Sequence, residues 1–109
     1  MVRQIAARIP IPDEKIEEFC RKWGVKRFEL FGSVLRADFD PDRSDVDAMV
    51  TLTDERSYTL FDLVHMEDEL VNIFGRKVHL TERSTVEESR NYIRRQHILA
   101  NTQDVYVVP

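Results

Sequence analysis

The segment of residues 30–50, LFGSVLRADFDPDRSDVDAMV, constrains the fold of this chain more than any other. Its first apolar stretch ends at Gly32, and its second carries two aspartates, Asp45 and Asp47, that are separated by one residue. Because side chains alternate along a strand, these two carboxylates are expected on one face and the apolar residues of the same stretch on the other. The sequence therefore predicts a strand that packs on a core with one face and presents acidic groups on the other.

Helix and strand signals alternate along the rest of the chain without an internal repeat. Apolar residues recur at helical spacing before Gly24 and again before Gly75, and a glycine in this place typically ends a helix. The expected elements are a helix from Pro12 and Asp13 to Gly24, a strand at 27–31, a helical turn at 34–37, a strand at 45–52, a long helix from Thr59 to Gly75, a strand at 77–81, a last helix opened by a capping box of Ser84 and Glu87, and a terminal strand or apolar tail at 105–108. This alternation predicts an α/β fold.

Length and composition limit the classes of protein to which the chain can belong. It has 109 residues, of which 42% are hydrophobic, and residues 1–109 are expected to form a single domain. The net charge of -4 argues against direct binding to nucleic acid, which relies on clustered Lys and Arg. A single cysteine, Cys20, excludes an internal disulfide, and no segment has the length of a membrane span or the pattern of a signal peptide. We therefore expect a cytoplasmic protein that does not contact a membrane.

The residues of segment 30–50 suggest a site for a metal-bound nucleotide. Two neighbouring carboxylates repel each other unless a divalent cation binds both, and oxygen ligands of this kind suit Mg²⁺. Gly32 lets the backbone approach a ligand closely, and Ser33, at the start of a helical turn, offers a hydroxyl and free N–H groups to a phosphate. An Asp-x-Asp or a Gly-Ser pair by itself is usually a solvated strand face or a turn. Their order along the chain, with a strand before the Gly-Ser pair and another carrying the aspartates, favours a site.

The stretch FGSVLRADFDPDRSDVDAMV resembles the signature of the DNA polymerase β-like nucleotidyltransferase superfamily. The small size of the chain is similar to that of the minimal nucleotidyltransferase (MNT) branch. Arg36 after the Gly-Ser pair, Ser44 before Asp45 and the later segment GRKVHL follow in the order of that branch. The resemblance implies a polymerase β-like nucleotidyltransferase fold, a small mixed β-sheet with helices packed on one face and the other face open to a nucleotide.

The same resemblance implies roles for individual residues. Gly32 and Ser33 would hold the triphosphate of ATP, and Arg36 would either meet a phosphate or simply lie exposed at the surface. Asp45 and Asp47 would hold Mg²⁺ or Mn²⁺ during in-line displacement at the α-phosphate.

One position departs from the superfamily pattern. His79, in the segment KVHL, stands where catalytic members carry a third carboxylate. An imidazole can accept a proton from the attacking hydroxyl or favour a softer ion, but it is a poor ligand for Mg²⁺. His79 therefore marks either a catalytic base or a degenerate site. Glu82 would replace the missing group only if the strand bends, because a regular strand points it to the opposite face.

Two hypotheses for the function follow from the resemblance. Small MNT proteins are commonly paired with a helical HEPN toxin, which implies that this chain is the antitoxin of a toxin–antitoxin pair. It would either transfer AMP from ATP to the toxin as an enzyme or neutralise the toxin by binding alone. The apolar residues at 105–108 are candidate contacts in a homo- or hetero-oligomer. The alternating charges from Glu82 to Arg95, in contrast, are most simply explained by a solvated helix face.

Overall fold

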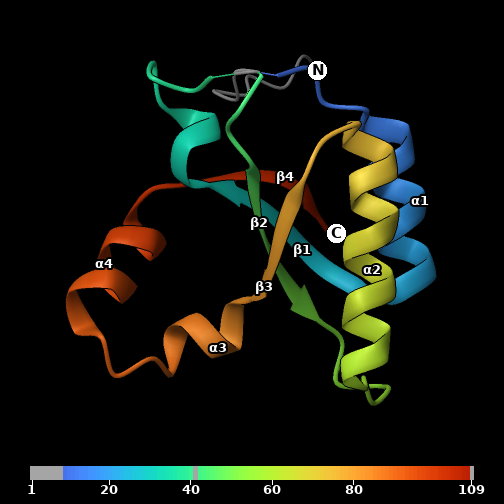
Figure 1. Cartoon of the computed structure of the whole chain (residues 1–109). Helices are drawn as coiled ribbons and strands as arrows, with labels where there is room; N and C mark the ends of the chain where they lie inside the picture. Colours follow the sequence, from blue (N-terminus) through green and yellow to red (C-terminus); the bar gives the residue numbers. More distant parts are fainter. Residues whose placement is uncertain (1–8, 41, 109) are drawn as a thin grey trace.

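A sheet with the strand order β3-β2-β1-β4 forms the middle of the molecule (Figure 1). The computed structural model describes residues 9–40 and 42–108, and all four strands lie in this part of the chain. The elements are α1 (Asp13–Trp23), β1 (Val25–Phe31), the 3₁₀ turn η1 (Gly32–Leu35), β2 (Val46–Leu52), α2 (Leu60–Phe74), β3 (Val78–Glu82), α3 (Arg83–Glu87), α4 (Tyr92–Ala100) and β4 (Thr102–Val107). The predicted α/β class is confirmed.

The sheet is mixed, as the resemblance implied. Strand β1 pairs antiparallel with β2 and with β4, whereas β2 and β3 run parallel. Parallel neighbours need a crossover connection, and α2 provides it between β2 and β3. The strand that carries Asp47 therefore lies inside the sheet, with a neighbour on each side.

Both long helices begin and end where the sequence predicted. Helix α1 follows Pro12 and ends at Gly24, and α2 follows Thr59 and ends at Gly75, with both glycines in the left-handed conformation. The Thr59 hydroxyl accepts a hydrogen bond from the N–H of Asp62 at 3.1 Å, and the Asp62 carboxylate accepts one from the N–H of Thr59 at 2.9 Å, which completes a capping box. Within the described residues, no helix has the length and apolar character that a membrane span requires.

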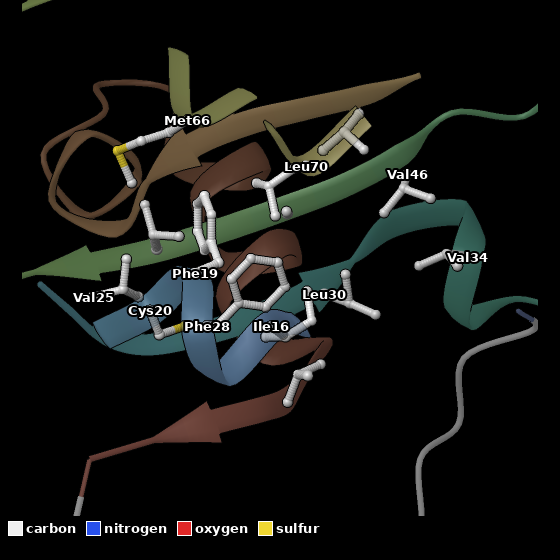
Figure 2. Packing of buried hydrophobic residues seen from close by; sticks show 14 of the residues in the cluster. Ile16, Phe19, Cys20, Val25, Phe28, Leu30, Val34, Val46, Met66 and Leu70 are labelled. Atoms are coloured by element: carbon white, nitrogen blue, oxygen red, sulfur yellow. The ribbon is translucent and has the colours of Figure 1, made fainter. Parts of the chain in front are cut away.

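The apolar core lies between the sheet and the two long helices, which are side by side on one face (Figure 1). Figure 2 shows how side chains from α1, α2 and the strands meet in this core. Its largest fully buried members include Ile16, Phe28, Leu30, Met66 and Leu70. Cys20 packs in the same core, and burial raises the pKa of its thiol to about 12.

Helices α3 and α4 lie on the other side of the sheet (Figure 1). A second and smaller apolar cluster of Met49, Val86 and Ile98 joins them to β2. The two long helices occupy one face, as the resemblance implied, and the two short ones additionally cover part of the second face. The open part of that second face is therefore narrower than expected.

The segment after β3 differs most from the prediction. The expectation of one last helix opened by Ser84 is wrong, because residues 88–91 separate α3 from α4 and Asn91 caps α4. Ser84 lies inside α3, where its hydroxyl donates a hydrogen bond to Glu82. Of the two alternatives for the chain end, the terminal strand is correct, and it begins at residue 102 instead of 105.

The remaining elements differ from the prediction only at their ends. Strand β1 begins two residues earlier than expected, β3 is shifted by one residue, and the helical turn covers 32–35 instead of 34–37. Strand β2 begins at Val46, so Asp45 lies just before it and not inside it.

Candidate functional site

One row of side chains crosses the sheet on the face that α3 and α4 partly cover. In the register of the sheet, Asp47 on β2 is the neighbour of His79 on β3 and of Phe31 on β1. Phe31 is in turn the neighbour of Thr102 on β4. All four residues line one cavity of about 910 Å³. The structure therefore brings two of the predicted site residues, Asp47 and His79, together on the sheet side of a cleft.

Gly32, directly after β1, lies against the Asp47 carboxylate. Its φ of 75° is in the left-handed region, and a Cβ atom at this position would lie 2.5 Å from Oδ2 of Asp47. Glycine alone combines this backbone conformation with so close an approach. The Gly32 corner and the carboxylate of β2 therefore face each other across the antiparallel pair of β1 and β2.

Asp45 contacts the third strand of the site. Its Oδ2 accepts a hydrogen bond from Nε2 of His79 at 2.8 Å, and the side chains of Asp45 and His79 are 34% and 52% exposed. The prediction that Asp45 belongs to the strand itself is wrong, because β2 begins one residue later, after the loop has reached the sheet. His79 is thus bonded to one aspartate and is the sheet neighbour of the other.

The electrostatics of Asp47 depend on burial and on four charged neighbours. Burial raises the pKa of Asp47 above its ordinary value, and the negative charge of Asp45 acts in the same direction. His79, when its imidazole is protonated, opposes this shift, as do Arg36 and Arg94, because positive charge favours the ionised carboxylate. A carboxylate that is partly desolvated beside another carboxylate gains from binding a cation, since the cation compensates both effects.

The other predicted residues are placed differently from one another. Arg36 lines the cavity, with its Nε donating a hydrogen bond to Asp38 at 3.1 Å and its side chain 56% exposed. Ser33 lies next to Gly32 in η1 but is not among the described residues that line the cavity. Glu82 pairs with Val50 in the sheet and so lies on the opposite face from His79, as a regular strand requires.

Helix α4 forms a second wall of the cleft, which the sequence analysis missed. The residues of α4 and of the segment after it that line the cavity include Arg94, His97, Ile98 and Asn101. Arg94 is exposed, as the interpretation of residues 82–95 as a solvated face predicts, but it additionally lines this cavity. A signal was present in the sequence, because Arg94 precedes the apolar Ile98 by four residues, and this spacing places both on one side of a helix.

An ion pair with a buried carboxylate attaches α3 to the sheet and contradicts the solvated-face interpretation for Arg83. Glu29 on β1 is fully buried, and both of its carboxylate oxygens accept hydrogen bonds from Nη1 of Arg83, at 2.7 and 2.9 Å. Nε of Arg27 lies 3.5 Å from the same carboxylate. A buried charge requires such partners, so Arg83 is held at the sheet. The ion pair therefore fixes the position of α3, which directly precedes the helix that forms the second wall of the cleft.

The donor groups fit a magnesium ion that binds together with a nucleotide. Within residues 9–40 and 42–108, no three His, Cys, Asp or Glu side chains are grouped so that they could hold a metal ion by themselves. However, Mg²⁺ usually binds through one or two carboxylates and takes its other ligands from substrate phosphates and water. Asp45 and Asp47 are near enough for the charge of Asp45 to raise the pKa of Asp47, and each offers carboxylate oxygens, but only Asp47 is among the described residues that line the cavity. His79 offers only nitrogen.

The mixed sheet, with carboxylates beside a glycine corner, defines the class of this protein as one with the polymerase β-like nucleotidyltransferase fold. The chain belongs to the nucleotidyltransferase domain family, whose model matches residues 13–101. A comparison with curated proteins finds no match.

Several solved structures share this fold. A toxin–antitoxin structure with AMP-PNP contains a chain with a TM-score of 0.66 and 15% identity, covering 90% of this chain and 75% of that one. A chain in the structure of the tri-AMPylated HEPN toxin of Shewanella oneidensis in complex with its MNT antitoxin has a TM-score of 0.58 and 15% identity, covering 88% and 70%. A protein assigned as a minimal nucleotidyltransferase has a TM-score of 0.62 and 25% identity, covering 84% and 86%.

Proposed function

We propose that this protein is a metal-dependent nucleotidyltransferase of the MNT type, which transfers AMP from ATP to a HEPN-family toxin and so acts as an antitoxin in the cytoplasm. Membership of the nucleotidyltransferase domain family supports the general kind of reaction. The observation that carries the proposal is the carboxylate of Asp47, which faces the Gly32 corner inside a cleft of about 910 Å³. A cleft of this volume is in the range of nucleotide-sized ligands.

In the proposed reaction, one group of residues binds the metal ion and another binds the phosphates. Asp45 and Asp47 would hold Mg²⁺ or Mn²⁺, which supplies charge neutralisation at the transferred phosphate when it is bound. Gly32 lets the phosphates approach the backbone, and Arg36 adds positive charge where it lines the cavity. Ser33, the next residue in η1, would offer its hydroxyl to the phosphates, although it is not among the described residues that line the cavity.

His79 is the candidate base for the acceptor hydroxyl. Its Nε2 donates to Asp45, which leaves Nδ1 as the ring atom that can accept a proton. The hydroxyl oxygen would then attack the α-phosphate, forming a phosphoester with the acceptor and releasing pyrophosphate. Asp45 would orient the imidazole during this step through the 2.8 Å hydrogen bond.

The proposed partner is a HEPN-family protein. Support comes from the likeness to chains of toxin–antitoxin structures, one of them with an MNT antitoxin bound to a HEPN toxin. Of the apolar residues at 105–108, Val107 and Val108 are 53% and 42% exposed and remain candidate contacts, whereas Val105 is buried.

A second candidate function is an antitoxin that neutralises its partner by binding without transferring AMP. The observation that favours it is His79, whose nitrogen is hydrogen-bonded to Asp45 where a third carboxylate would complete a ligand set. In this case the nucleotidyltransferase fold is retained as a binding scaffold.

Transfer of label from ATP separates the two candidates. The protein is incubated with ATP that is radiolabelled at the α-phosphate, with Mg²⁺ or Mn²⁺ and with the candidate HEPN partner, and the partner is analysed for label. Asp45→Asn and Asp47→Asn remove the acidic pair, and Asp42→Asn, at an exposed position in the preceding loop, is the matched control. Label on the partner that is lost in the first two variants and kept in the control would support the transferase.

The opposite result is equally informative. Absence of label, together with toxin neutralisation that none of the three substitutions affects, would contradict the transferase and support the binding antitoxin.

A further inference from the structure

Helix α4 places one arginine over the part of the sheet that carries Asp47. Arg94 and Ile98 are four residues apart and therefore lie on the same side of α4. Ile98 packs in the small apolar cluster with Met49, which follows Asp47 by two residues and so shares its face of β2. The side of α4 that packs on the sheet thus carries Arg94 to the cavity that Asp47 also lines.

The guanidinium group of Arg94 has no fixed partner among residues 9–40 and 42–108. It makes no hydrogen bond or ion pair with the side chains or backbone of this part of the chain, yet it lies near enough to Asp47 to oppose the rise in that carboxyl's pKa. Three nearby arginines are already occupied: Arg36 donates to Asp38, Arg83 to Glu29, and Arg95 to the carbonyl groups of Glu87 and Ser89. Arg94 is therefore available to a negatively charged ligand in the cleft.

We propose that Arg94 binds the β- and γ-phosphates of the nucleoside triphosphate from the α4 wall of the cleft. This inference rests on the proposed function, because it names a contact within the same site. Asp47 lines the sheet side of the cavity, so a cation on α4 attracts the phosphate oxygens that face away from this carboxylate. A planar guanidinium suits this task because it can donate to two phosphate oxygens at once.

The wall that carries Arg94 is fixed by contacts in which a nucleotide takes no part. The ion pair of Glu29 and Arg83 holds α3, and the packing of Ile98 on Met49 holds α4. A binding group on a wall that is already in place loses little freedom when the ligand arrives. Arg94 itself is exposed, so its substitution leaves these structural contacts intact.

Calorimetric titration without the toxin tests this assignment. The ligands are α,β-methylene-ATP, which cannot be cleaved at the α-phosphate, and AMP, each with Mg²⁺. Arg94→Gln is expected to bind the triphosphate about 10- to 100-fold more weakly than the wild type, the range for losing a charge-assisted bond, with AMP binding unchanged. The affinity of Arg94→Lys for the triphosphate is expected to lie between those of the wild type and Arg94→Gln. Arg90→Gln, at an exposed position before α4, is the matched control for charge and is expected to bind like the wild type.

The outcomes separate this inference from the function on which it rests. Equal affinity of wild type and Arg94→Gln for the triphosphate would overturn the role of Arg94 while leaving the proposed function standing. An equal loss for triphosphate and AMP, or an equal loss in the Arg90 control, would also overturn it. If the wild type binds neither ligand, the proposed nucleotidyltransferase function fails, and this inference fails with it.

Discussion

Replacing Gly32 with alanine tests whether the approach of this residue to Asp47 shapes the site. The new Cβ would lie 2.5 Å from Oδ2 of Asp47, and the backbone would keep a φ of 75° that alanine disfavours. The oxygen is the end of a side chain that can rotate, so we expect Asp47 to turn away from the corner while β2 stays in place. The variant should therefore fold and yet lose the orientation of this carboxylate.

A second glycine provides the control for backbone strain. Gly75 also has a φ of 70°, but no atom lies within 4 Å of the position that its Cβ would take. Because the left-handed conformation costs an L-residue about 1–2 kcal/mol, Gly75→Ala is expected to reduce the free energy of unfolding by that amount. Gly32→Ala should lose the same and in addition about 0.5–1.5 kcal/mol for forcing the Asp47 side chain from its rotamer.

Two measurements check this prediction. Urea unfolding followed by the fluorescence of Trp23 gives the free energy of unfolding of each variant. Titration with Mg²⁺ and α,β-methylene-ATP gives the affinity, which Gly32→Ala is expected to lose and Gly75→Ala to keep. If both variants lose equal stability and both bind like the wild type, the contact between Gly32 and Asp47 does not shape the site, and the reasoning is refuted.

Three further predictions concern the fold. The N–H of Thr59 lowers the pKa of Asp62, so stabilisation by this carboxylate is present above its unfolded-state pKa and lost as the pH falls through the lower folded-state pKa. The difference in urea stability between wild type and Asp62→Asn is therefore expected to shrink on acidification, and a constant difference would contradict the capping box. Arg83→Met leaves Glu29 buried without its main partner and is expected to lower the free energy of unfolding by about 3–5 kcal/mol. The double variant with Glu29→Leu should recover most of this loss, and an equal loss in the single and double variants would contradict the pairing. Because burial raises the pKa of Cys20 to about 12, the thiol is expected to react with Ellman's reagent only after unfolding, and rapid labelling of the folded protein would contradict its burial.

The ends of the long helices were predictable because their signals act locally. Gly24 and Gly75 end α1 and α2 through a backbone conformation that depends on glycine itself. Thr59 caps α2 through a residue three positions away. Such interactions form between residues that are near in sequence, so the ends of these helices can be predicted without knowing the rest of the fold.

The segment from Arg83 to Ala100 was not predictable in the same way, because a distant contact decides its shape. A capping box of Ser84 and Glu87 is a plausible local signal, but α3 begins at Arg83, which is bonded to Glu29 on β1. Glu29 stands within the apolar run of a strand, and the sequence does not show which residue will neutralise it. The partner is separated from it by 54 positions along the chain, and only the folded sheet brings the two together.

The site was predictable in part for a related reason. Alternation along one strand gave the face of Asp47, and the Gly-Ser pair gave the corner opposite it, since both are short-range patterns. The hydrogen bond between Asp45 and His79 depends on strand register, and the wall that carries Arg94 depends on the path of α4. These are tertiary features. The spacing of Arg94 and Ile98 places both on one side of a helix, but it does not tell where that helix lies on the sheet.

The two faces of the sheet carry different groups: one packs on the main apolar core, and the other carries the candidate ligands. On the face of α1 and α2, a continuous apolar core is buried, and none of the candidate ligands takes part in it. On the other face, the small cluster around Met49 and the buried charge of Glu29 are the means by which α3 and α4 are attached. Met49 lies on the same strand as Asp47, and Glu29 lies on the neighbouring strand β1. A substitution that weakens this attachment is therefore expected to displace the second wall of the cleft as well as to reduce the free energy of unfolding, whereas a substitution in the core of α1 and α2 acts on stability without touching the candidate ligands.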